Sequence, residues 1–196
     1  WYKFYQGKKT IMRKKILTAL LTTAAIMPAM AQNSKPGKLS KEEKKILQQR
    51  IDSALFAQAE TAINDTAFTL EANQVVFKSG DMAEVTPSTN FVAVNKDNAV
   101  VQLAMNTPLA GANGMGGITV SGQMSGYKIS KDKKGNVYVQ MSVSGNAISA
   151  QVFITLWNGS NTANISVQPN FNSNRMTLNG NILPYAKSHV VQGNTL

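Results

Sequence analysis

Hydrophobic residues follow two different periods along this chain, and the change falls near residue 65. Between residues 41 and 63 they recur three or four positions apart, as on one face of an α-helix: Leu47, Ile51, Leu55, Ala59 and Ala62. Ser40 stands three residues before Glu43, which is the spacing of a capping box at a helix start. We therefore expect one amphipathic helix within residues 40–66.

From residue 67 onward, apolar residues alternate with polar ones. In the clearest run, Val137, Val139, Met141 and Val143 occupy every second position. This period predicts antiparallel strands with one buried face. Clusters of Gly, Asn and Asp separate the runs, as in β-hairpins. Eight strands are predicted, near residues 67–78, 90–95, 99–105, 117–130, 136–144, 147–157, 162–169 and 175–183.

Eight successive hairpin-linked strands favour an up-and-down meander over residues 67–196. Closing the meander into a barrel removes the exposed edges that an open sheet must protect. The interior of an eight-stranded barrel has room for side chains or for one small ligand. The predicted fold is therefore mainly β, a small lipocalin-like barrel preceded by the amphipathic helix. A two-sheet β-sandwich is the alternative.

The first 31 residues have the pattern of a secretory signal peptide. Met12 begins a Met-Arg-Lys-Lys segment, an apolar stretch fills residues 16–27, and small residues stand at Ala29 and Ala31. We expect translation to start at Met12, cleavage to follow Ala31, and residues 32–39 to form a flexible lead-in. The apolar stretch is too short for a bilayer anchor, so no transmembrane segment is expected in the mature chain.

The net charge of +10 is concentrated in the N-terminal part of the chain. Residues 1–31 carry six basic residues and no acid, and residues 32–50 carry six basic residues and two acids. Residues 51–196 carry equal numbers of each sign. The predicted barrel is therefore neutral, which argues against nucleic acid as a partner.

The residue inventory excludes several kinds of chemistry. The chain has no cysteine, which excludes disulfides, thiolate metal sites and a lipid-modified N-terminal cysteine, so it is not a lipoprotein. Its one histidine, His189, cannot form a histidine cluster for a metal. The sequence predicts no catalytic residue, no metal site and no cofactor, and hence a non-enzymatic protein. A carboxylate-dependent hydrolase with two paired acids is the lesser alternative.

The apolar register of the strands contains short and flexible side chains that could surround a ligand. If the barrel holds a cavity, this lining suits a small apolar ligand. Its predicted members are Val139, Met141, Val152, Ile154, Ile165 and Met176. The alternative is that these side chains fill the barrel, and that the protein is a structural or protein-interaction module of the cell envelope.

Three aromatic residues fall on the otherwise polar register: Tyr138, Phe153 and Trp157. We expect them to lie beneath the helix. The alternative is that they face water and mark a surface for a partner or a glycan.

Two short segments, Asp52-Ser53-Ala54 and Asp65-Thr66-Ala67, resemble the acceptor motif for O-glycosylation in Bacteroides-type bacteria. The resemblance implies Thr66 as the better candidate site, because it lies at the expected helix-to-strand turn. Ser53 is the second candidate.

Several segments together resemble a known family. They are Asn90-Phe91-Val92, Gly116-Gly117-Ile118-Thr119-Val120-Ser121-Gly122, Tyr127, and Val152-Phe153-Ile154-Thr155-Leu156 with its Asn158-Gly159 turn. Their order over residues 45–190 is similar to that of DUF4251, an uncharacterised family of short exported proteins from Bacteroides-type bacteria. The resemblance implies a β-rich domain in the periplasm of a Gram-negative cell or secreted from it. It assigns no catalytic or binding residue.

Overall fold

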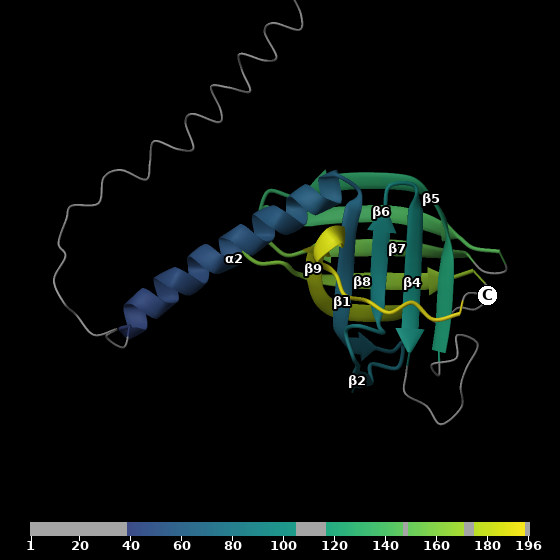
Figure 1. The fold of residues 1–196 in the computed structure, drawn as a ribbon, viewed down its shortest axis with the longest axis horizontal. Coiled ribbons are helices and arrows are strands. Elements are labelled where there is room, and N and C mark those ends of the chain that lie inside the picture. The colour runs from purple at the N-terminus through teal and green to yellow at the C-terminus, as the bar shows by residue number, and fades with distance from the viewer. Residues whose placement is uncertain (1–38, 105–116, 147–148, 171–174, 195–196) are drawn as a thin grey trace, which may run out of the picture. The chain divides into compact units, whose positions relative to one another are not determined.

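The computed structural model describes residues 39–104, 117–146, 149–170 and 175–194. The predicted signal peptide, and the lead-in up to residue 38, lie outside the described residues. The compact unit that begins at Ser40 contains one long helix followed by a β-barrel (Figure 1).

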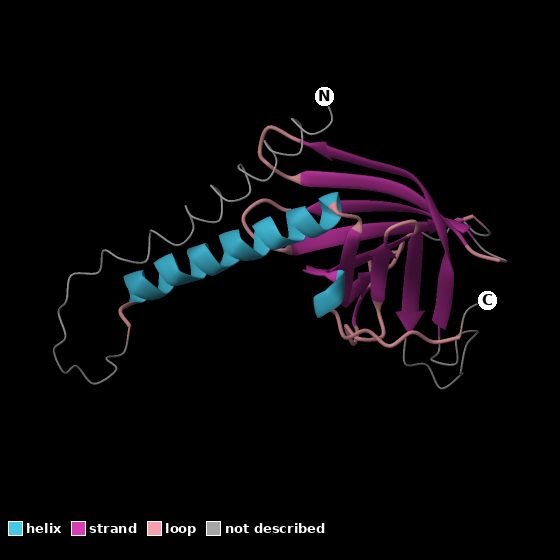
Figure 2. Cartoon of the chain, turned by 45° about the horizontal axis from the view of Figure 1, so that its top comes forward, coloured by secondary structure: helices cyan, strands magenta, loops and turns pink. Residues whose placement is uncertain are grey.

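Helix α2 (Lys41–Asn64) begins at the predicted capping box. The Ser40 backbone N–H donates to Glu43 Oε2 over 2.8 Å, and the Glu43 N–H donates to Ser40 Oγ over 3.2 Å. Only the C-terminal part of the helix is buried, at Ala59, Ala62 and Ile63. The N-terminal half projects away from the barrel, as Figures 1 and 2 show, and residues 41–51 are all exposed.

Nine strands follow the helix in the described part of the chain. Eight correspond to the predicted strands, which confirms the reading of the alternating pattern. The short β2 was not predicted, because three residues are too few to show a period of two. The strands are β1 (Ala67–Val76), β2 (Met82–Glu84), β3 (Phe91–Asn95), β4 (Asn98–Ala104), β5 (Gly117–Lys131), β6 (Val137–Ser144), β7 (Ser149–Leu156), β8 (Thr162–Pro169) and β9 (Met176–Pro184).

Pairing of the first strand with the last closes the sheet. One edge of β1 pairs with β9 from Phe68 to Val76. Its other edge pairs with β3 over residues 67–71 and with β2 over residues 74–76. Each remaining strand pairs with its sequence neighbour, and all pairs are antiparallel. The fold is a closed eight-stranded barrel with β2 as an extra strand, which confirms the barrel and not the sandwich.

The long strand β5 connects β4 on one side of the barrel to β6 on the other. Its first half pairs with β4 and its second half with β6, with an irregular register between Ser125 and Lys128. In Figure 1 the strands β1 and β4, with the first part of β5, run across β6–β9, which lie behind them. The backbones of β5 and β6 come very close at Gly122. A Cβ at this position would stand 1.8 Å from the Ser144 carbonyl oxygen, so only glycine fits.

The barrel interior is one continuous apolar cluster. It takes in the inward residues of β1, β3, β4 and β6–β9, and the end of α2 packs against it through Ala59 and Ile63. The Tyr127 hydroxyl on β5 donates to the Ile63 carbonyl oxygen over 2.7 Å, which holds the helix end to the barrel. Burial raises the pKa of Tyr127, so this hydroxyl keeps its proton at physiological pH.

The C-terminal segment covers part of the barrel's outer surface. After β9 the chain forms a short 3-10 helix, η1 (Tyr185–Lys187), and residues 188–194 then run across β1 and β4 (Figure 1). We call residues 188–194 the tail. Beneath this region, outward-facing Phe91, Gln102 and Thr119 are buried. The strict alternation therefore breaks down in β3 and β4, whose two faces are both largely covered.

Gln102 is the polar centre that binds the tail. Its Nε2 donates to the carbonyl oxygens of Thr89 (3.0 Å) and Val191 (2.8 Å). Its Oε1 accepts from Thr119 Oγ1 (3.0 Å) and from the Gly193 N–H (2.8 Å). These four bonds use the full capacity of a side-chain amide. A fully buried glutamine is thereby satisfied, half of its bonds coming from the tail.

We expect Gln102→Leu to lower the free energy of unfolding by about 2 to 3 kcal/mol, because it leaves several buried backbone groups without a partner. Urea denaturation followed by circular dichroism measures this. Gln151→Leu is the matched control, since Gln151 is exposed on β7. Equal midpoints for the two variants would contradict a structural role for Gln102.

Candidate functional site

The six residues predicted to line a ligand cavity do share the barrel interior. Val139, Met141, Val152, Ile154 and Ile165 are only 0 to 2% exposed, and Met176 packs against the same cluster from one end. Side chains this buried contact protein atoms on all sides and border no open space of ligand size. Their packing favours the filled-core alternative, and the ligand-lining role stays a prediction.

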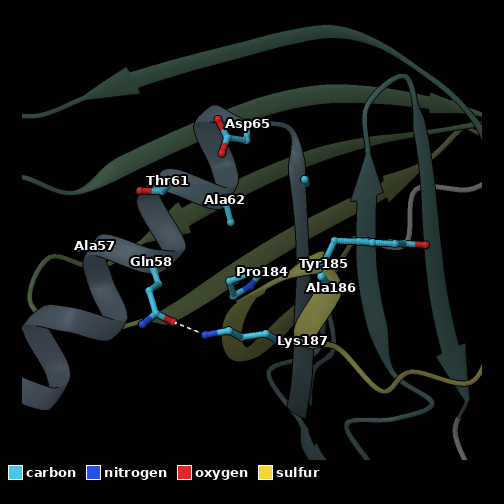
Figure 3. Close-up of a pocket in the computed structure, with 10 residues that line it drawn as sticks. Ala57, Gln58, Thr61, Ala62, Asp65, Pro184, Tyr185, Ala186 and Lys187 are labelled. Atoms are coloured by element: carbon cyan, nitrogen blue, oxygen red, sulfur yellow. Dashed lines mark hydrogen bonds between the residues drawn. The ribbon is translucent and has the colours of Figure 1, made fainter. Parts of the chain in front are cut away.

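An open groove lies between the end of α2 and the start of the C-terminal segment (Figure 3). Its volume is about 450 Å³. The Gln58 Oε1 accepts a hydrogen bond from Lys187 Nζ over 3.0 Å across it. Its lining consists mostly of small side chains: Ala57, Gln58, Thr61, Ala62, Asp65, Ala67, Pro184, Tyr185, Ala186 and Lys187. Nothing in the sequence pattern predicted this groove.

The aromatic residues on the polar register lie on the outside of the barrel. Tyr138, Phe153 and Trp157 are 37, 39 and 44% exposed. The expectation that the helix covers them is wrong, because α2 packs mainly on β1 and β9. The structure instead agrees with the alternative of a surface that faces water.

The strand register places polar side chains directly beside these rings. Phe153 on β7 stands opposite Gln140 on β6 and Ser166 on β8. Tyr138 on β6 stands opposite Thr155 and is diagonal to Phe153. Residues in these positions of antiparallel strands are close enough for their side chains to act together. We call Tyr138, Phe153 and Trp157 with their polar neighbours the aromatic face.

Amide groups lie on the same outer surface as the rings. Gln140 and Gln151 are exposed and Asn164 is half-buried, and within the described residues their side chains make no hydrogen bond to the protein. Arg175 is held on the same surface by its Nε–H, which donates to Ser166 Oγ over 2.8 Å. The aromatic face thus combines rings with neutral donors and acceptors.

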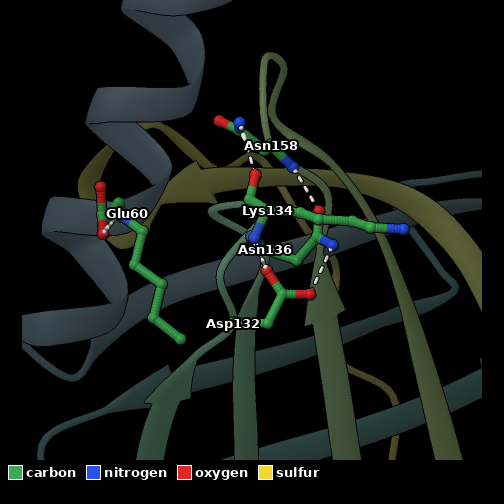
Figure 4. A network of polar contacts seen from close by, with 6 residues as sticks. Glu60, Asp132, Lys134, Asn136 and Asn158 are labelled. Atoms are coloured by element: carbon green, nitrogen blue, oxygen red, sulfur yellow. Dashed lines mark hydrogen bonds and ion pairs between the residues drawn. The ribbon is translucent and has the colours of Figure 1, made fainter.

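Asp132 organises the turn between β5 and β6 (Figure 4). Its Oδ1 accepts from the backbone N–H groups of Lys134 (2.8 Å) and Asn136 (2.9 Å). Its Oδ2 accepts from Asn136 Nδ2 (2.9 Å) and from the Tyr138 hydroxyl (3.0 Å). The hydroxyl of one ring of the aromatic face is therefore held by a carboxylate that is itself fixed in a turn.

A second set of bonds joins this turn to the one between β7 and β8. The Asn158 N–H donates to Asn136 Oδ1 over 3.0 Å, and Asn158 Nδ2 donates to the Lys134 carbonyl oxygen over 2.9 Å. Trp157 directly precedes Asn158, so its backbone shares this anchorage. The turns next to Tyr138 and Trp157 are therefore bonded to each other.

The two predicted glycosylation residues occupy different settings. Thr66 is half-buried between α2 and β1, with the left-handed φ of 49° that is uncommon outside glycine. Ser53 is exposed in mid-helix, and its hydroxyl donates to the Gln49 carbonyl oxygen over 2.8 Å. Modification of either residue stays a prediction.

The remaining candidate residues for acid–base or metal chemistry include Glu71 and His189. Glu71 Oε1 accepts from Ser188 Oγ (2.8 Å) and from the His189 N–H (3.3 Å), which binds the start of the tail to β1. The His189 side chain is exposed. In the described ranges, no three Asp, Glu or His side chains gather as a metal site would require.

Comparison with known proteins settles the family. The profile of a domain of unknown function, DUF4251, matches residues 50–182. The chain belongs to the DUF4251 family. It is 48% identical to a DUF4251 family protein from Bacteroides eggerthii of known crystal structure, with a TM-score of 0.64. The match covers 71% of this chain and 94% of that one.

These findings confirm the resemblance noted in the sequence. None of the curated proteins matches this DUF4251 chain. No helix in the described part of the chain has the length and apolar character needed to cross a membrane.

The turn of this DUF4251 protein should loosen in acid. Partial burial raises the pKa of Asp132, but its four hydrogen bonds together outweigh that effect and hold the pKa below its ordinary value. The stabilisation is therefore present above the unfolded pKa of about 3.9 and is lost as pH falls through the lower folded pKa. An NMR titration of the Asn136 side-chain amide should report a midpoint below 3.9, and Asp132→Asn should abolish it. A midpoint at or above the unfolded value would contradict this assignment.

Proposed function

We propose that this protein is an exported, soluble, non-enzymatic binding module that holds neutral carbohydrate chains on its aromatic face. The observation that carries the proposal is the row of exposed rings, Tyr138, Phe153 and Trp157, beside amides that have no partner in the described protein. This is the interaction-module alternative of the sequence analysis, with a stated ligand class and surface.

The chemistry of the aromatic face suits sugars. A pyranose ring presents C–H groups on its faces, which pack against an aromatic ring, and hydroxyls at its edge, which both donate and accept hydrogen bonds. The amides of Gln140 and Gln151 can do both in return. The side chains paired across the strands with Phe153 and Tyr138, those of Gln140, Ser166 and Thr155, are uncharged, and this supports a neutral chain as the ligand.

Two features favour surface binding over the competing functions. The interior side chains that a carrier would use are packed against one another. Asp132 is the carboxylate that contacts one of the rings. Both of its side-chain oxygens already accept hydrogen bonds from the turn and from Tyr138. The geometry therefore supports neither a ligand inside the barrel nor a carboxylate pair at this face as well as it supports binding on the outside.

We expect the mature chain to be retarded in native gels that contain a neutral polysaccharide, tested with hydroxyethylcellulose, xylan, mannan and pullulan. Phe153→Ala and Trp157→Ala should each weaken binding about fivefold to tenfold, as loss of one ring contact costs about 1 kcal/mol. Titration calorimetry with the matching soluble oligosaccharide measures the change without avidity.

Tyr185→Ala is the matched control, because Tyr185 is similarly exposed, at 43%, but lies in η1 away from the aromatic face. It should bind like the unchanged protein. No retardation by any of the four polysaccharides, or equal losses in Tyr185→Ala and Phe153→Ala, would overturn the proposal.

Export is part of the proposal, supported by the signal-like pattern before Ala31. The chain recovered from the periplasm or medium of a Bacteroides-type host should have the intact mass of a polypeptide that begins at Gln32. A covalent excess that disappears in Thr66→Ala would locate O-glycosylation. Recovery of the unprocessed chain from the cytoplasm would contradict export.

A further inference from the structure

A polar hollow opens on the outside of the barrel, at the end of β6, β7 and β8 that lies away from Tyr138 and Trp157. Its volume is about 270 Å³, and its described lining contains no charged and no aromatic side chain. We call this hollow the polar cleft. The polar side chains in its lining are Ser142, Ser144, Ser149, Gln151, Gln168 and Asn170.

The polar cleft continues the aromatic face along the same strands. Cross-strand pairing arranges the outward side chains of β6–β8 in rows. The row through Phe153 is followed by two rows that belong to the cleft, Ser142 with Gln151 and Gln168, and Ser144 with Ser149. Rows on one face are two residues apart, so the last row lies about 13 Å from Phe153. Rings and cleft therefore form one uninterrupted strip of surface.

The polar groups of the cleft are not used by the fold. Within the described ranges, the side chains of Ser144, Gln151 and Gln168 make no hydrogen bond to the protein, and all three residues are exposed. The backbone around them is fixed. The Ser149 N–H donates to Asn170 Oδ1 over 3.1 Å, and the Asn170 N–H donates to the Ser149 carbonyl oxygen over 2.9 Å. The cleft thus presents unpaired hydroxyls and amides on a rigid framework.

We propose that the polar cleft is a second subsite of the carbohydrate site, and that the protein binds neutral chains of several sugar units laid along β6–β8. This inference rests on the proposed function and extends its binding surface. Phe153 takes one sugar by the face of its ring, and the cleft takes hydroxyls of units further along the same chain. A single sugar on Phe153 does not reach side chains about 13 Å away, so short ligands leave the cleft empty.

The chemistry of the cleft suits sugar hydroxyls. Each hydroxyl donates and accepts, and the amides of Gln151 and Gln168 do both in return. An acidic ligand would find no cationic side chain in the described lining. A peptide strand added to the sheet would need unpaired backbone groups, but β6, β7 and β8 are each paired on both edges. Side-chain hydrogen bonds to a hydroxyl-rich chain are therefore the interaction that this surface offers.

NMR titration with a disaccharide and a hexasaccharide of the same series tests the subsite, using cello-, xylo-, manno- and malto-oligosaccharides. The hexasaccharide should bind at least about tenfold more tightly, and only it should shift the side-chain amide signals of Gln168. Gln168→Ala should weaken hexasaccharide binding about fivefold, as loss of one hydrogen bond costs about 1 kcal/mol, and should leave disaccharide binding unchanged. Phe153→Ala should weaken both.

Gln49→Ala is the matched control, because Gln49 is an exposed glutamine on α2, away from β6–β8. It should bind both ligands like the unchanged protein, and circular dichroism should show the same fold for all the variants. If Phe153→Ala weakens binding but Gln168→Ala has no effect, or affects both ligands equally, the second subsite is overturned and the proposed function stands. If no oligosaccharide of any series binds, both are overturned.

Discussion

Closure of the sheet by β1 and β9 is the interaction on which the rest of this structure depends. Pairing from Phe68 to Val76 with the last strand brings inward side chains of β1 and β9 into the same apolar cluster as those of the other strands. It also gives the backbone edges of both strands partners, which an open sheet would leave exposed. Because closure fixes which face is inside, it also determines which residues remain outside to meet other molecules.

The apolar cluster of this protein lies inside the barrel, and the outer surface has three distinct parts. The tail covers the outside of β3 and β4 and binds to Gln102. The aromatic face on β6 and β7 is exposed, and two joined turns flank Tyr138 and Trp157. The helix and η1 form a groove at one end of the barrel. These three parts use different residues.

Local pattern alone predicted most of the elements and part of the candidate site. The helix start at Ser40 and the strands from β5 onward follow from spacing that a few neighbouring residues display. Tyr138 and Phe153 were recognised as exceptions to that spacing, but the prediction that the helix covers them was wrong. Their exposure depends on where α2 docks, and α2 docks on β1 and β9, whose positions relative to β7 come only from closure. The burial of Gln102 could not be predicted from local pattern, because its partner Val191 lies 89 residues away.

The sequence by itself determined the period of each segment, and hence the helix, eight strands and the apolar identity of the barrel's inside. Only the tertiary structure decided that Phe68 pairs with Pro184, that the tail buries one outer surface, and that small residues from α2 and η1 form a groove. The physical reason is range. Side-chain periodicity records which residues share a face, whereas contacts between distant segments depend on how all the faces are satisfied together.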